Sequence, residues 1–159
     1  MTAQLRDSVL VDGIRMQLTG RNYPTSTLHI PSSIADKAKE GDADDGLMSG
    51  TWCHRGYVAS WSIEHGRLHL LDIHGGRRLR GPAPAFAWWY SGTVHVGGGE
   101  LLIMGMYGMD AQFEQERIYT IQYGIVRAVR RIEHTPETAQ AAFDAAGSAR
   151  RNIGFSPEV

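Results

Sequence analysis

Apolar residues recur at every second position in several short stretches of the chain, and glycines separate these stretches. Tyr57, Ala59, Trp61 and Ile63 give the clearest example. A period of two is typical of β-strands that bury one face. We therefore predict strands over residues 57–63, 68–73, 92–96, 100–106, 117–123 and 125–132, with the alternate apolar side chains turned toward one shared core.

Short turn sequences lie between these strands. Asp12-Gly13 separates two apolar runs and favours a type I′ hairpin turn, because both central residues must tolerate a positive φ. His65-Gly66, Gly97 to Gly99 and Gly124 are further predicted turns. Short turns favour antiparallel neighbours. The chain is therefore expected to be mainly β, an antiparallel meander of about eight strands that forms a barrel or a sandwich.

The pattern changes near the C-terminus. Thr135-Pro136-Glu137 is typical of a helix start, with Thr135 as the N-cap and Pro136 in the first helical position. One short C-terminal helix is predicted there. Residues 1–134 are expected to form the antiparallel β domain, and residues 135–159 to add the helix and tail to the same domain.

Composition narrows the class of protein. With 42% hydrophobic and 21% charged residues, the chain matches soluble globular domains. Cys53 is the only cysteine, which rules out an internal disulfide and fits a reducing compartment. No signal sequence and no apolar run of membrane-spanning length is seen. We expect a cytoplasmic protein that does not contact a membrane.

The charge balance argues against nucleic acid as the ligand. The net charge is −1, whereas binding to phosphate backbones needs a positive surface. Arginines cluster at 77, 78 and 80 and again at 127, 130 and 131. Such clusters at strand ends are usually solvated edges, so nucleic-acid binding is not expected.

Aromatic residues are the most informative candidates for a binding surface. Trp88 and Trp89 are adjacent, so in an extended chain they point to opposite faces and one of them is expected to be exposed. We predict that alanine at Trp89 weakens partner binding more than it lowers stability. The predicted contact surface consists of Arg55, Trp88, Trp89, Tyr90 and the acidic residues Asp42, Asp44 and Asp45.

No catalytic or metal-binding motif stands out. The histidines lack the spacing of zinc ligands, and Ser91 lacks the glycine context of a nucleophile elbow. We expect no catalytic residue, no metal and no cofactor. The alternative hypothesis is an interior pocket of a β-barrel, in which Arg55, Tyr57, His69 and Glu116 supply the few polar groups.

Two segments carry a resemblance. Residues 52–73 read WCHRGYVASWSIEHGRLHLLDI, and residues 86–96 read FAWWYSGTVHV. Together they resemble a group of small bacterial β-domain proteins with no established activity. The resemblance implies a β fold over about residues 7–129 and implies no ligand or site residue. Gly50-Thr51-Trp52 is also similar to the first strand of lipocalins.

These observations favour a non-catalytic binding protein that recognises another protein. A bacterial immunity protein or antitoxin-type inhibitor fits its size and its acidic segment. The alternative is a small-molecule-binding β-barrel or an enzyme with an interior pocket. A homodimer that docks through the C-terminal helix is a third hypothesis.

Overall fold

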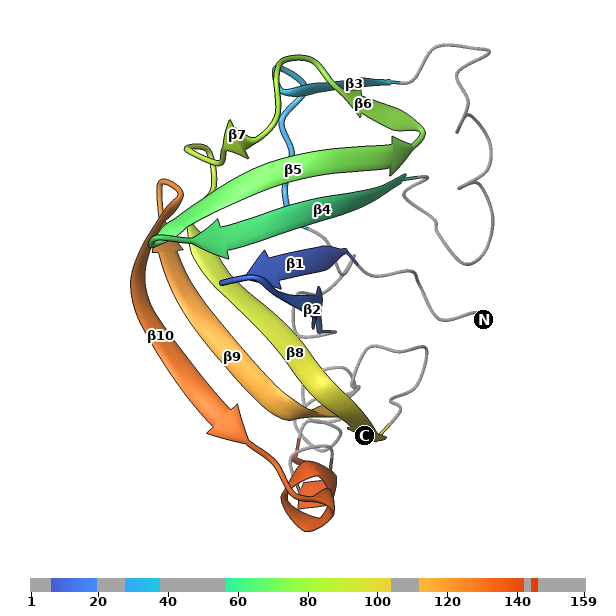
Figure 1. Cartoon of the computed structure of the whole chain (residues 1–159), viewed down its shortest axis with the longest axis vertical. Coiled ribbons are helices and arrows are strands. Elements are labelled where there is room, and N and C mark those ends of the chain that lie inside the picture. Colours follow the sequence, from blue (N-terminus) through green and yellow to red (C-terminus); the bar gives the residue numbers. More distant parts are fainter. Residues whose placement is uncertain (1–6, 20–27, 38–56, 104–111, 142–143, 146–159) are drawn as a thin grey trace, which may run out of the picture.

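The computed structural model describes residues 7–19, 28–37, 57–103, 112–141 and 144–145. Within these ranges the protein is mainly β, as predicted, and residues 136–141 and 144–145 are helical (Figure 1). The strands are β1 (Ser8–Val11), β2 (Ile14–Leu18), β3 (Ala35–Lys37), β4 (Tyr57–Glu64), β5 (Arg67–Gly75), β6 (Arg77–Leu79), β7 (Ala85–Phe86), β8 (Gly92–Ile103), β9 (Gln112–Gln122) and β10 (Ile125–Glu133).

The main sheet has eight strands in the order β10-β9-β8-β2-β1-β4-β5-β7, and β3 and β6 form a separate antiparallel pair. An additional pairing joins β10 to β5 through Ile125 and Arg67. This pairing closes the strand order into a ring, as in a barrel. β10 leaves β5 immediately after this contact, and β7 takes the same edge of β5 through the pairs His69–Phe86 and Leu70–Ala85.

The alternating pattern of β4 is confirmed. Tyr57, Ala59, Trp61 and Ile63 are all buried and belong to one hydrophobic core. Side chains from β1, β2, β5, β8 and β9 complete this core. The largest side chains with almost no exposed surface are Trp61, Met16, Leu18, Leu68, Leu70, Val9, Val11, Val94 and Val96.

Three hairpins have turns of the same backbone type. Asp12-Gly13, His65-Gly66 and Tyr123-Gly124 each have two consecutive residues with positive φ, between 48° and 84°. Positive φ at both central positions is the signature of a type I′ turn, which matches the twist of the flanking strands. The turn also changes one expectation: Tyr123, expected on a buried strand face, lies in the turn and is 67% exposed.

The strand order departs from the predicted meander, because β2 pairs with β8 and β5 pairs with β7 and β10, and one pairing is parallel. β1 lies parallel to β4, with Val9 opposite Trp61, whereas every other pairing among the described strands is antiparallel. Asp7 explains how β1 is held there. Its carboxyl group accepts hydrogen bonds from the Ala59 amide at 3.0 Å and the Trp61 indole N–H at 2.9 Å. The buried Asp7 side chain therefore fixes the start of β1 against the middle of β4.

The predicted turn at Gly97 to Gly99 is wrong, because these glycines lie inside the twelve-residue strand β8. A Cβ on Gly97 would lie 2.2 Å from Phe113 Cδ2, and a Cβ on Gly98 would lie 2.8 Å from Met16 Cε. Gly99 has a φ of 75° at a shift in register between β8 and β9. The glycines thus make room for two large side chains and form a bulge, and the chain continues in the same direction.

The predicted helix start is confirmed. Thr135 Oγ1 accepts a hydrogen bond from the Thr138 amide at 3.3 Å, and Thr138 Oγ1 accepts one from the Thr135 amide at 2.7 Å. This reciprocal arrangement is a capping box in which a threonine takes the place usually held by glutamate. Ala139 on the first turn is fully buried.

Candidate functional site

The seam of the barrel is the point where β10 separates from β5, and residues 85–91 fill it. The turn at Tyr123-Gly124 packs directly on this segment. The Gly124 amide donates to the Tyr90 carbonyl at 2.9 Å, and the Tyr123 amide donates to Ser91 Oγ at 2.9 Å. A Cβ on Gly124 would lie 2.6 Å from the Ala87 carbonyl oxygen, so glycine permits the close approach of the two segments.

The adjacent tryptophans have different environments, as their positions in the chain predict. Trp88 is 55% exposed, whereas Trp89 packs against the core and donates its indole N–H to the His29 carbonyl at 2.7 Å. The two rings meet edge to face, with 5.8 Å between centroids. Trp89 is therefore the structural partner and Trp88 the exposed one. Trp88 is therefore the better of the two residues at which to test binding, and the predicted effect of Trp89→Ala on partner binding stays a prediction.

Tyr90 also has a structural role in the seam. Its hydroxyl donates to the Thr93 carbonyl at 2.7 Å, and its ring packs against the core. Burial raises the pKa of the Tyr90 hydroxyl, because the phenolate would be poorly solvated there. Trp88 is thus the one member of the predicted trio Trp88, Trp89 and Tyr90 that presents its ring mainly to solvent.

Phe86 connects the seam to the outer face of β5. The Arg67 guanidinium lies 5.5 Å from the centre of the Phe86 ring, and the His69 ring lies 5.6 Å from it. Arg67 and His69 are two residues apart on β5, so their side chains leave the sheet on the same side. We define the seam surface as Phe86, Trp88 and Tyr123 together with Arg67.

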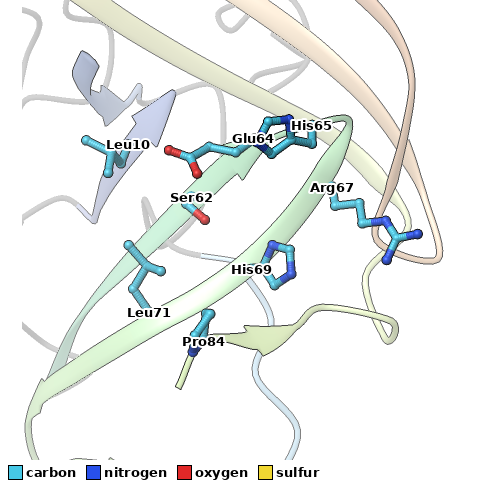
Figure 2. Close-up of a pocket in the computed structure, with 8 residues that line it drawn as sticks. All are labelled: Leu10, Ser62, Glu64, His65, Arg67, His69, Leu71 and Pro84. Atoms are coloured by element: carbon cyan, nitrogen blue, oxygen red, sulfur yellow. The ribbon is translucent and has the colours of Figure 1, made fainter. Parts of the chain in front are cut away.

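An open pocket of about 560 Å³ lies beside the seam surface, on the outer face of β1, β4 and β5. Figure 2 shows the Glu64 carboxylate and the Ser62 hydroxyl directed toward this hollow, with His69 beside them, while Arg67 extends away from it. The residues that line it are Leu10, Ser62, Glu64, His65, Arg67, His69, Leu71 and Pro84.

The three residues of the alternative pocket that fall within the described ranges are not brought together. Tyr57 is in the core, with the Arg77 guanidinium 5.2 Å from its ring. His69 lies on the outer face, and Glu116 on β9 is buried with its Oε2 3.0 Å from His134 Nε2. The structure does not bring these three side chains into one site, and Arg55, the fourth residue of the predicted pocket, lies outside the described residues.

The remaining predicted contact residues, Arg55, Asp42, Asp44 and Asp45, lie outside the described residues. Among the residues that are described, no three histidine, cysteine, aspartate or glutamate side chains group closely enough to hold a metal ion. In the same ranges, no helix is long and apolar enough to cross a membrane.

Sequence reasoning missed the pocket, although one signal was available. A two-residue turn at His65-Gly66 fixes the register of the hairpin, so Glu64 must oppose Arg67, and Ser62 must oppose His69. The same logic could not reveal Asp7, because its partners are 52 and 54 residues away.

Comparison with known proteins adds no assignment. No family model, no curated protein and no solved structure matches this chain.

Proposed function

We propose that this protein is a non-catalytic recognition domain that binds a partner protein through the seam surface. The observation that carries the proposal is the exposure of Trp88, which is 55% exposed beside Trp89, a residue that packs against the core. Burying an aromatic side chain of this size contributes about 2 kcal/mol. A partner that covers the exposed Trp88 ring would therefore gain this free energy on binding. Tryptophan and arginine are also the residue types that dominate binding energy in protein interfaces.

The geometry around Trp88 holds it in place before any partner arrives. Its amide donates to the Phe86 carbonyl at 2.9 Å, and its ring meets the ring of Trp89 edge to face. Trp89 in turn donates its indole N–H to the His29 carbonyl. A side chain that is already ordered loses little conformational entropy on binding. This arrangement supports a role for Trp88 as an anchor.

The chemistry of the surface indicates what the partner presents. Trp88 and Tyr123 offer apolar area, and the exposed Arg67 is oriented by the Phe86 ring. A complementary surface has an apolar depression for the indole and a carboxylate near it for the guanidinium, because arginine pairs with carboxylates through two parallel hydrogen bonds. The expected partner is therefore a folded protein with an acidic rim around an apolar depression.

A photocrosslinking amino acid tests the proposal when placed at position 88 and, as the matched control, at position 101. Leu101 on β8 is also an exposed apolar side chain but lies at the far end of that strand from the seam. A partner captured at 88 and not at 101 is then purified. Its affinity is expected to fall at least about tenfold on Trp88→Ala, in the range of interface hot spots.

Two results contradict the proposal. One is equal capture at both positions, which indicates nonspecific adhesion to apolar side chains. The other is capture of a second copy of this chain, together with a dimer by light scattering that Trp88→Ala dissociates. In that case the seam surface is a self-association interface.

A narrower version of the proposal is that the partner is a bacterial toxin and that this chain is its immunity protein or antitoxin-type inhibitor. The modest size of the domain and the acidic sequence at Asp42, Asp44 and Asp45 support this version. It predicts that the captured partner has an enzymatic activity that the purified chain suppresses at one-to-one stoichiometry. A partner whose activity is unchanged in the complex contradicts the inhibitor version and leaves the recognition role standing.

A further inference from the structure

Glu64 and Arg67 face each other across the β4–β5 hairpin, yet they do not pair. The register places them directly opposite one another, where opposite charges can form a stabilising pair. Instead, the Arg67 guanidinium lies over the Phe86 ring. No ion pair joins Glu64 to any other residue in the described ranges, and its carboxylate is directed into the pocket (Figure 2).

Ser62 supplies a second, independent observation. It is only 5% exposed, and the structure shows no hydrogen bond from its hydroxyl to any residue in the described ranges. The hydroxyl points into the same hollow, between Glu64 and His69 (Figure 2). The Ser62 hydroxyl oxygen is not among the fully buried side-chain atoms of the described residues that lack a partner, so it is accessible from the pocket. It is therefore available to a donor on a ligand that enters the pocket.

The pocket thus combines hydrogen-bond acceptors with apolar walls. The Glu64 carboxylate, the Ser62 hydroxyl and an unprotonated ring nitrogen of His69 can each accept a hydrogen bond. Leu10, Leu71 and Pro84 provide aliphatic surface next to them. A volume of about 560 Å³ lies within the range of pockets that bind small organic groups.

We infer that this pocket binds a primary ammonium group carried on an aliphatic stem. An ammonium has three N–H donors and no acceptor, which matches an acceptor set that contains one negative charge. Its methylene stem gains from contact with the aliphatic walls, as lysine stems do on apolar surfaces. The pocket shares Arg67 with the seam surface, but Glu64, Ser62 and His69 are not part of that surface, and the inference does not depend on the proposed function.

Two sources offer this group: a free alkylamine and a lysine side chain on another protein. Both present the same chemistry to Glu64 and Ser62, and they differ in what extends beyond the pocket mouth. A carboxylate ligand is not expected, because the Glu64 charge would repel it and the Arg67 guanidinium lies over the Phe86 ring and extends away from the pocket (Figure 2). A neutral alkyl chain would contact the walls but leave the acceptors without donors.

Nuclear magnetic resonance titration of the isotope-labelled full chain tests the inference with four probes. The probes are pentylamine, N-acetyl-lysine methylamide, N-acetyl-norleucine methylamide as the neutral analogue of the same stem, and hexanoate. The inference predicts saturable shifts at the amides of residues 62–71 with pentylamine, with the lysine derivative or with both. The norleucine derivative and hexanoate are expected to bind at least about tenfold more weakly, because they lack the charge-assisted hydrogen bond to Glu64.

Variants locate the site. Glu64→Gln keeps the shape of the side chain and is expected to weaken ammonium binding about tenfold, since it removes the charge. Glu100→Gln, which removes an exposed carboxylate on β8, is the matched control and leaves the affinity unchanged. The probe series on the unaltered protein keeps the test valid even if a variant is unstable.

Tighter binding of pentylamine than of the lysine derivative identifies a free amine as the ligand, and the reverse order identifies a lysine side chain. Either order supports the inference. Equal affinities for the lysine and norleucine derivatives overturn it, and so does an affinity that Glu64→Gln leaves unchanged. Neither result bears on Trp88, so the failure of this site and the failure of the seam surface are distinguishable.

Discussion

The carboxyl group of Asp7 accepts a hydrogen bond from the indole N–H of Trp61 at 2.9 Å, and both side chains are fully buried. The second carboxyl oxygen accepts from the Ala59 amide at 3.0 Å. Asp7 thus satisfies two donors of β4 at the point where β1 joins it in parallel. Without this residue, two N–H groups in the core would have lost their acceptor.

Replacement of Asp7 tests this relationship. Asp7→Ala is expected to lower the free energy of unfolding by about 3 kcal/mol, because it leaves buried donors unsatisfied. Urea denaturation followed by circular dichroism measures the change. Asp36→Ala is the control: Asp36 pairs with Arg80 at the surface, and its loss is expected to cost less than about 1 kcal/mol. Equal effects of the two variants would contradict a structural role for the Asp7 carboxyl group.

Gly97 and Phe113 give a second prediction about stability. Gly97→Ala places a Cβ 2.2 Å from Phe113 Cδ2 and is expected to destabilise the protein by about 2 kcal/mol through overpacking. In the double variant with Phe113→Leu, the alanine is expected to cost less than in the native background, which a double-mutant cycle measures. Gly81→Ala, with open space around the added methyl, is the control. If the effects of the two substitutions on the free energy of unfolding are additive, the clash with the Phe113 ring is not the cause of the destabilisation.

The two tryptophans of the seam are expected to respond differently to truncation. Trp89→Ala removes a ring packed on the core and a hydrogen bond to the His29 carbonyl, so it is expected to cost about 2 kcal/mol or more. Trp88→Ala removes a mainly exposed ring and is expected to cost less than about 1 kcal/mol. Thermal unfolding of the two variants side by side measures the contrast, and a reversed order would contradict the geometry of the seam.

Tyr90 makes stability sensitive to alkaline pH. An unfolded-state tyrosine ionises near pH 10, whereas burial raises the pKa of Tyr90 in the folded state. The unfolded state therefore releases its proton first, so this residue's contribution is fully present below about pH 10 and declines as the pH rises further. Tyr90→Phe is expected to lose less stability than the native protein between about pH 9.5 and 11.5, the range in which an ordinary tyrosine and Tyr90 differ in ionisation. An identical slope in the variant would show that Tyr90 does not titrate with folding.

The hairpins could be predicted from sequence because their causes are local. Asp12-Gly13 and His65-Gly66 adopt the positive φ values that the sequence suggests, and the alternation from Tyr57 to Ile63 fixes which face is buried. Local patterns carry no information about partners far along the chain. The parallel pairing of β1 with β4 depends on Asp7, whose bonding partners are more than 50 residues away.

The glycines at 97 to 99 and the adjacent tryptophans show a second limit. Three consecutive glycines have the composition of a turn, but here they accept the side chains of Phe113 and Met16 against a continuous strand. Likewise, the sequence indicates that Trp88 and Trp89 differ in exposure. Which of the two is held against the protein depends on the hydrogen bond from Trp89 to the His29 carbonyl, 60 residues away. Glu116 is buried with its carboxylate 3.0 Å from His134 Nε2, a partner 18 residues away that the local pattern does not indicate.

Recognition of a partner through Trp88 is tested most directly by fluorine nuclear magnetic resonance of the protein labelled with 5-fluorotryptophan. The Trp88 signal is assigned by its loss in the variant Trp88→Phe. In the free protein, the Trp88 signal is predicted to move when water is replaced by deuterium oxide, and the signal of buried Trp61 is predicted not to move. On addition of the partner captured at position 88, the Trp88 signal is predicted to shift and to lose its sensitivity to the solvent. A Trp88 signal that stays solvent-sensitive in the saturated complex would contradict recognition through the seam surface.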